Sequence, residues 1–245
     1  MVIQDGIKQT AEEICSFLMI GQSNMAGRGD FGEVEPVKNE KCYMLRMGRW
    51  QKMSEPINPD RSIFGTFHSG VCLAASFADE VAKRSGARVG LIPCADGGTR
   101  ISQWMPGELL YDHAVAMTRL AMRTSRLCGI LWHQGESDCH DDEGLAAHKQ
   151  KLITVMRSLR HDLGDDSLPI IMGELSENIT EKWKVGDCPV RMNRTFGDVA
   201  AELGNCAVVS AAGLTLKADG LHFDSASLRV FGKRYAEAYF NMRGM

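Results

Sequence analysis

Hydrophobic residues along the chain alternate between two kinds of pattern. Short runs rich in Ile, Val and Leu are separated by longer segments whose apolar residues recur every three or four positions. Runs of the first kind are typical of parallel strands buried on both faces, and segments of the second kind are typical of crossover helices. The pattern predicts five parallel strands, at 16–21, 89–93, 129–133, 169–173 and 207–210.

Helical spacing fills the segments between these runs. Apolar stripes predict one helix that ends at Gly86, a second over 110–121, a long third that ends at Gly164 and a fourth over 226–242. Glycine suits the left-handed residue that often terminates a helix. Strands alternating with helices favour an α/β protein, a three-layer α/β/α sandwich around a five-stranded parallel sheet.

Residues 28–68 interrupt the alternation with several Pro and Gly residues and a possible small hairpin around 43–50. A loop this long inside a compact domain tends to be functional. We find neither an internal repeat nor a linker, so residues 1–245 are predicted to form a single domain, with 1–15 as an N-terminal extension.

Composition narrows the class of protein. The chain has 245 residues, 28 basic and 31 acidic side chains, and 44% hydrophobic residues. The near balance of charge argues against nucleic acid as a partner, and the apolar content argues against disorder. No window approaches the roughly 18 apolar residues of a membrane span, and the first fifteen residues lack the features of a secretory signal. We therefore expect a cytoplasmic protein with no membrane partner.

Eight cysteines are scattered through the chain, several in apparent core segments (Cys72, Cys94, Cys128 and Cys206). A chain of this length does not need disulfides to be stable, so free buried thiols are expected. Zinc binding by Cys128, His133, Cys139 and His140 is disfavoured because their spacing lacks a paired C-x-x-C or H-x-x-x-H.

Polar, glycine-rich segments follow the predicted strands, at the edge of a parallel sheet where ligands collect. Ser23 follows the first strand, while Asp219 and His222 lie in the last loop, spaced so that the carboxylate can orient the imidazole. Taken singly, Ser23 is more simply a helix N-cap, and Asp219 and His222 a turn residue and a surface histidine. Their joint occurrence favours a serine nucleophile with its base.

Four sequence segments, in their order along the chain, resemble the SGNH/GDSL hydrolase superfamily. Their residues are similar to those of carbohydrate esterase family 6, which has acetylxylan esterase-like and sialate O-acetylesterase-like domains. The segments are FLMIGQSNMAGRG, IPCADGGTRISQW, ILWHQGESD and DGLHFD. The resemblance covers about residues 17–240. It implies a flavodoxin-like SGNH hydrolase fold.

The resemblance implies that Ser23 is the nucleophile, His222 the general base and acid, and Asp219 the carboxylate that orients His222. It implies an oxyanion hole built from the backbone N–H groups of Ser23 and Gly98 and the side-chain amide of Gln134. The third block commonly has Asn where this chain has Gln134. Glu136 is a rival to Asp219, because geometry rather than sequence position defines such a triad.

The expected function is hydrolysis of O-acetyl esters on a carbohydrate through an acetyl-serine intermediate, with no metal or other cofactor. Two alternatives remain open: a non-catalytic carbohydrate-binding domain of the same fold, and an esterase for lipid or thioester substrates.

Four further positions have both a structural and a functional interpretation. Trp104 and Arg100 either border the pocket or, for the tryptophan, close a loop by packing. His133 is expected to be a satisfied core histidine, and His68 a cap or a pocket wall. The acidic residues Asp138, Asp141, Asp142 and Glu143 are expected to form a solvated helix start.

Overall fold

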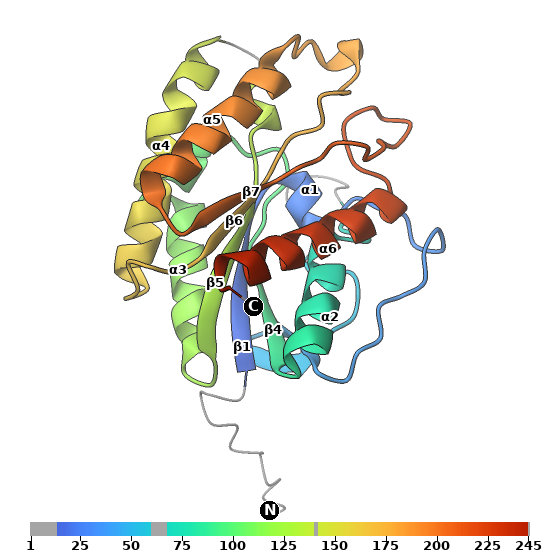
Figure 1. Ribbon diagram of the computed structural model, residues 1–245, viewed down its shortest axis with the longest axis vertical. Helices are drawn as coiled ribbons and strands as arrows, with labels where there is room; N and C mark the ends of the chain where they lie inside the picture. The colour runs from blue at the N-terminus through green and yellow to red at the C-terminus, as the bar shows by residue number, and fades with distance from the viewer. Residues whose placement is uncertain (1–13, 60–67, 140–141, 245) are drawn as a thin grey trace, which may run out of the picture.

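A computed structural model describes residues 14–59, 68–139 and 142–244 of the chain. Most of the predicted N-terminal extension, His140 of the zinc candidates and Asp141 of the acidic run therefore lie outside the described residues. The described chain folds into one sheet covered by helices on both faces (Figure 1).

Seven strands form the sheet, in the order β3-β2-β4-β1-β5-β6-β7. All neighbours pair in parallel except β2 and β3. The strands are β1 (Ile14–Gly21), β2 (Cys42–Arg46), β3 (Arg49–Lys52), β4 (Arg88–Pro93), β5 (Arg126–His133), β6 (Ile170–Gly173) and β7 (Cys206–Val209). The five predicted strands are thus present, and the predicted purely parallel five-stranded sheet is corrected to a mixed sheet of seven.

The two additional strands are the hairpin predicted around 43–50. Its first strand pairs in parallel with β4, and its second forms the exposed edge. The sequence indicated the hairpin but not its attachment to the sheet, because only three residues of β2 pair with β4. The predicted boundary of the extension also moves, since β1 begins at Ile14, before Ser16.

In the described part of the chain, six α-helices accompany the strands: α1 (Ser23–Ala26), α2 (Leu73–Ser85), α3 (Leu109–Met122), α4 (Asp142–Asp162), α5 (Cys188–Leu203) and α6 (Ser225–Met242). One face of the sheet packs against α2 and α6, and the other against α3, α4 and α5. The predicted helices are confirmed in place, and α5 is an element that the sequence interpretation missed. The architecture is the expected three-layer α/β/α sandwich.

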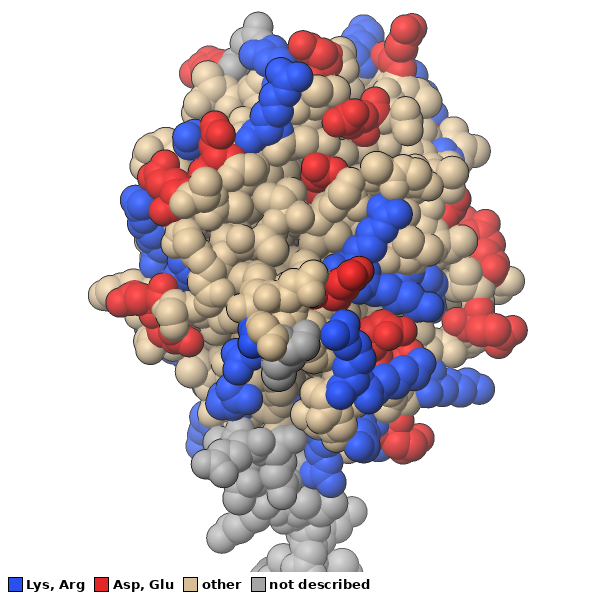
Figure 2. All heavy atoms as spheres, in the orientation of Figure 1, with Lys and Arg blue, Asp and Glu red and all other residues tan. Residues whose placement is uncertain are grey.

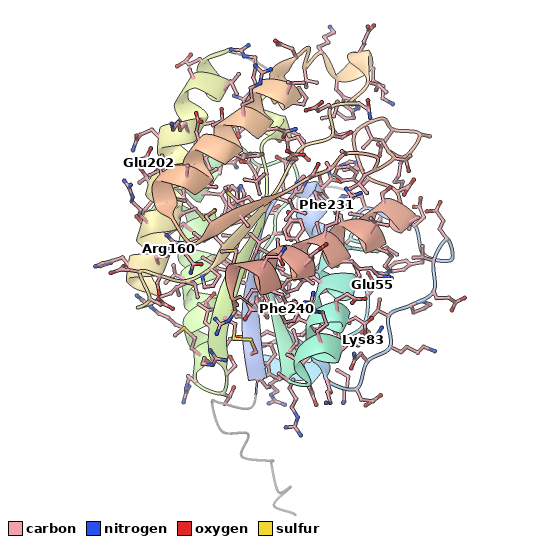
Figure 3. The ribbon with its side chains drawn as sticks, in the orientation of Figure 1. Glu55, Lys83, Arg160, Glu202, Phe231 and Phe240 are labelled. Atoms are coloured by element: carbon pink, nitrogen blue, oxygen red, sulfur yellow. A yellow bond between two sulfur atoms is a disulfide. The ribbon has the colours of Figure 1, made fainter. Side chains whose placement is uncertain are left out.

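Aromatic rings fill both halves of the core. Phe17 of β1 meets Phe77 of α2 and Tyr239 of α6 at centroid distances of 4.8 and 5.0 Å. Figure 3 shows Phe231 and Phe240 on α6, and both side chains are buried in this half of the core. On the opposite face Trp104 packs edge-on against Trp132 at 5.7 Å. The sheet that carries the strand ends is therefore held between two packed layers.

Polar contacts join the helices to the edges of the core. Arg160 of α4 donates to the carbonyls of Leu203, Gly204 and Asn205, where α5 ends (Figure 3). Leu203 is the last residue of α5, so its carbonyl has no partner within the helix and the guanidinium supplies the missing donor. Glu55 lies beside α6, where it pairs with Arg229.

Two disulfides correct the expectation of free thiols. Cys15 is bonded to Cys128, and Cys139 to Cys188. The first joins the neighbouring strands β1 and β5, and the second joins the loop after β5 to the start of α5. The described free cysteines are Cys42, Cys72, Cys94 and Cys206. Cys72 and Cys94 are buried, as expected, and burial raises the pKa of each thiol to about 12.

Charge is mixed over the surface. Figure 2 shows basic and acidic side chains interspersed over one face, with Lys and Arg more crowded toward its lower part. Among the described helices, none is long and apolar enough to span a bilayer.

Candidate active site

The turn out of β1 places Ser23 at the carboxyl edge of the sheet. Gly21 has φ +133°, and a Cβ there would lie 2.1 Å from the carbonyl oxygen of His133 on β5. The N–H of Gln22 donates to that same carbonyl at 2.8 Å. Glycine thus lets β1 turn sharply against β5, and Ser23 follows at the start of α1, 5% exposed.

The loop before α6 brings Asp219 and His222 together. One carboxylate oxygen of Asp219 accepts from the backbone N–H groups of Leu221 and His222, each at 2.9 Å. The other lies 2.8 Å from Nδ1 of the His222 ring. The D-x-x-H spacing therefore closes a turn in which the carboxylate grips both the backbone and the imidazole.

His222 also faces the hydroxyl of Ser23, with 2.9 Å between Nε2 and Oγ. The Asp219 contact favours the tautomer with the proton on Nδ1, which leaves Nε2 free to accept from the hydroxyl. Residues 199 positions apart thus form a continuous Ser23–His222–Asp219 chain of hydrogen bonds. This arrangement can move a proton from an alcohol to an imidazole.

The electrostatics of Asp219 fit this role. Partial burial raises the pKa of its carboxyl group, but the hydrogen bonds from the backbone and ring of His222 and from the Leu221 N–H outweigh burial. The net pKa lies below the ordinary value, so Asp219 is ionised at neutral pH. A carboxylate in this position stabilises an imidazolium on His222.

Glu136, the rival carboxylate, lies elsewhere in the network. It is buried, and its Oε1 accepts from the Asn24 side chain at 2.7 Å. Asn24 in turn accepts from the backbone N–H of Phe223 at 3.1 Å. Among the described contacts Glu136 makes none to His222, and it connects the helix of Ser23 to the loop of His222 through Asn24.

Two backbone N–H groups are available beside the Ser23 hydroxyl. Those of Ser23 and Gly98 have no hydrogen-bond acceptor among the described residues, and both residues line the same pocket. Gly98 has φ +75°, a left-handed conformation that suits glycine. These are the two backbone donors that the resemblance implies.

Gln134 does not reach the pocket, which corrects its predicted role as a direct oxyanion donor. Its side chain is fully buried, and its Nε2 lies 2.6 Å from Asp138 Oδ2 and 3.0 Å from the Thr99 carbonyl. Its Oε1 lies 3.1 Å from Nε2 of His148. Both ends of the amide are therefore held inside the protein.

The pocket has a volume of about 350 Å³. Besides Ser23, Gly98 and His222, its walls include two arginines, Arg28 and Arg100, and an aromatic side chain, Trp183. Arg100 was one of the residues expected to border the pocket. Trp183 was missed, because only the fold brings the loop before α5 beside the loop of His222.

Trp183 also supports the loop that carries His222, since its indole N–H donates to the Asp219 carbonyl at 2.8 Å.

Trp104 does not border the pocket, because it is 1% exposed and packs on Trp132. Of its two interpretations, the packing one is correct.

Buried polar groups lie behind the pocket. Both ring nitrogens of His133 lack a hydrogen-bond partner among the described residues, so the ring is buried as expected but is not satisfied. Burial lowers the pKa of His133, and it lowers that of His148 to about 3. Both rings are therefore neutral, and each packs against phenylalanine rings.

Three other predicted positions are resolved. Asp138 is buried rather than solvated, and it accepts from the Ile101 N–H at 2.9 Å; burial raises the pKa of its carboxyl group. Glu143 is exposed, as expected for a solvated helix start. His68 is exposed and is not part of the pocket wall.

The zinc candidates do not assemble. Cys128 and Cys139 belong to separate disulfides. Within 14–59, 68–139 and 142–244, no group of three His, Cys, Asp or Glu side chains is placed to hold a metal ion.

A three-layer α/β/α protein with Ser23, His222 and Asp219 at the carboxyl ends of its strands has the architecture of SGNH-like hydrolases. Residues 14–241 match the model of the family described as carbohydrate esterase, sialic acid-specific acetylesterase, and the chain belongs to this family. The wider SGNH resemblance is confirmed at this level, whereas the match does not specify carbohydrate esterase family 6.

Relatives agree with this membership. The chain is 32% identical over 248 residues to a probable carbohydrate esterase of Arabidopsis thaliana, covering 92% of this chain and 90% of the relative. The crystal structure of that same Arabidopsis thaliana protein superposes with a TM-score of 0.82 at 30% identity, covering 94% of this chain and 98% of the other. The structure of NanS superposes with a TM-score of 0.77 at 18% identity, covering 96% and 99%, and supports the fold alone.

Proposed function

We propose that this protein is a serine esterase that hydrolyses O-acetyl esters on carbohydrates, as acetylxylan esterases and sialate O-acetylesterases do. The observation that carries the proposal is the 2.9 Å contact between Ser23 Oγ and His222 Nε2, with Asp219 2.8 Å behind the ring. Family membership supports the ester and carbohydrate classes. Within that family, we propose carbohydrate esterase family 6 as the subgroup.

In the proposed reaction Ser23 Oγ attacks the acetyl carbonyl while its proton passes to His222 Nε2. The tetrahedral oxyanion accepts hydrogen bonds from the backbone N–H groups of Ser23 and Gly98. The bond to the sugar oxygen then breaks, and the His222 imidazolium gives its proton to that oxygen, which leaves an acetyl-serine.

Deacylation repeats the sequence with water. Water loses a proton to His222 and attacks the acetyl-serine, the bond to Ser23 Oγ breaks, and the proton returns to Oγ as acetic acid departs and ionises in solvent. Asp219 stays ionised throughout and stabilises the imidazolium in each half-reaction.

The pocket walls support a polar substrate. Arg28, Arg100 and Trp183 line the pocket that holds Ser23, and side chains of these types can bind the hydroxyls, any carboxylate and the faces of a sugar. The volume of about 350 Å³ lies at the lower end of small-molecule sites and favours one or two sugar units.

The test is acetate release from 4-nitrophenyl acetate and from a panel of acetylated sugars, for the wild type and Ser23→Ala. We expect the variant to lose at least about 10³-fold in kcat, because no other group replaces the nucleophile. Reaction with a sulfonyl fluoride should label Ser23 in the wild type. A Ser23→Ala protein that still releases acetate at nearly the wild-type rate would refute the assignment.

A further inference from the structure

The oxyanion position beside Ser23 has two backbone donors, and the amide expected to supply a third is held inside the protein by Asp138, Thr99 and His148. A second glutamine lies nearer. Gln22 immediately precedes Ser23, and it is one of the residues that line the pocket with Ser23, Gly98 and His222.

The orientation of the Gln22 amide is fixed by what surrounds its oxygen. Oε1 lies 3.4 Å from the backbone nitrogen of Gly135, 3.4 Å from that of Ser137 and 3.3 Å from the Gln134 amide nitrogen. All three are donors, so the atom that faces them is the acceptor. The amide nitrogen must then point the other way.

That nitrogen has no protein acceptor in the described part of the chain, and it is not one of the enclosed polar atoms that lack a partner. Gln22 is 2% exposed, so the little surface that it has lies at the pocket. A primary amide donates two hydrogen bonds. Two N–H bonds of Gln22 therefore remain for a group that enters beside the Ser23 hydroxyl.

We infer that the side-chain amide of Gln22 is the third oxyanion donor of the acetyl-transfer reaction, in place of Gln134. The inference rests on the proposed esterase function. Gln134 donates a hydrogen bond to Oε1 of Gln22 from the side away from the pocket. The amide is held from behind before substrate arrives, and such preorganised donors stabilise a developing negative charge most effectively.

The Gln22→Glu variant tests hydrogen-bond donation by the side-chain NH₂ separately from the structural role of the side-chain oxygen. The substitution keeps an oxygen for the N–H groups of Gly135 and Ser137, but it replaces the donor NH₂ by an acceptor. We expect kcat for 4-nitrophenyl acetate to fall by about 10²- to 10³-fold with KM little changed, the signature of an interaction made in the transition state. Gln150→Glu, an exposed change of the same kind on α4, should leave both constants unaltered.

Inhibition by a trifluoromethyl ketone gives a second measurement, which would not change if the role of Gln22 were only structural. Its adduct with Ser23 carries a tetrahedral oxyanion, so its Ki for Gln22→Glu should rise in proportion to the loss in kcat/KM. Thermal unfolding of the variant should remain cooperative. If Gln22→Glu does not fold, Gln22→Met removes the amide without adding charge, and the same loss is expected.

Outcomes separate the inference from the function on which it rests. Gln22 variants with wild-type kcat and Ki, beside an inactive Ser23→Ala, would overturn the inference alone. A raised KM with unchanged kcat and Ki would assign the amide to ground-state binding and would also overturn it. An active Ser23→Ala would remove the proposed function together with the inference.

Discussion

Asp219 holds His222 through both of its carboxylate oxygens, one on the backbone and one on the ring. This double grip explains why the D-x-x-H spacing was informative in the sequence: the turn itself aligns the carboxylate with the imidazole. Glu136 also lines the pocket, yet its hydrogen bond goes to Asn24. The choice between the two carboxylates thus depended on contacts that sequence position cannot give.

Asp219→Asn distinguishes the two carboxylates by activity. The amide keeps an oxygen for the backbone N–H groups but presents its NH₂ to Nδ1, which favours the tautomer with the proton on Nε2. We expect kcat to fall by about 10⁴-fold, as the equivalent change does in a serine protease triad. Glu136→Gln, which keeps the acceptor for Asn24, should cost far less. Equal losses in steady-state kcat for the two variants would return Glu136 to the triad.

At the scale of elements, the five predicted strands were recognisable from their apolar runs, and most of the helices from apolar residues that recur every three or four positions. The missed α5 also carries a signal, with Pro at its start and buried residues at spacings of three to four, among them Met192, Phe196 and Val199. Asn193 and Gly197 interrupt that stripe in the sequence. Asn193 is buried because its amide bonds both backbone groups of Leu175, a contact that no periodicity reveals.

The site was predictable to a similar extent. Ser23, Asp219 and His222 were found because each follows a strand or lies within a recognisable turn, and Gly98 was implied by the family resemblance. Gln22 and Trp183 were not found, because the direction in which each side chain points depends on contacts with residues that are distant in the sequence. Gln134 was misplaced for the same reason, because its neighbours Asp138 and His148 capture its amide.

The Cys139–Cys188 disulfide couples two elements around the site, the loop after β5 and the first residue of α5. It closes a loop of 49 residues. Loss of such a link typically lowers the free energy of unfolding by about 2–4 kcal/mol. We expect that loss for the Cys139→Ser/Cys188→Ser double variant in urea titrations, and a much smaller one for Cys206→Ser, where the thiol is free. Were the double variant as stable as the wild type, the bond would contribute nothing to the fold.

At the scale of the whole molecule, the site lies on a layer of buried polar side chains rather than on a purely apolar core. His133, Gln134, Glu136, Asp138 and His148 are all less than 5% exposed. Several of their polar atoms have no partner among the described residues, including Nδ1 of His148 and Oε2 of Glu136. Unpaired buried groups destabilise a fold, so this layer lowers the free energy of unfolding while it positions the pocket residues.

The burial of His148 in this layer predicts a pH dependence of stability. His148 is neutral in the native state, where burial lowers its pKa to about 3, whereas in the unfolded chain it takes up a proton near pH 6.5. Below about pH 6.5 the unfolded state binds more protons than the native state. The contribution of His148 to the free energy of unfolding is therefore greatest above about pH 6.5 and decreases as the pH falls toward 3. Nearby Asp138, 4.0 Å away, has a pKa raised by burial and so acts in the opposite direction near its own titration.

His148→Gln isolates this contribution, because glutamine can still donate to the Gln134 oxygen but does not titrate. Between pH 6.5 and 4, we expect the wild type to lose up to about 1.4 kcal/mol of unfolding free energy per pH unit more than the variant. Urea titrations at half-unit pH steps measure the difference. His113→Gln is the matched control, since that side chain is exposed on α3, and its curve should follow that of the wild type. Parallel curves for His148→Gln and the wild type would mean that the native protein protonates His148 as readily as the unfolded chain does, and hence that the polar layer opens to water below the site.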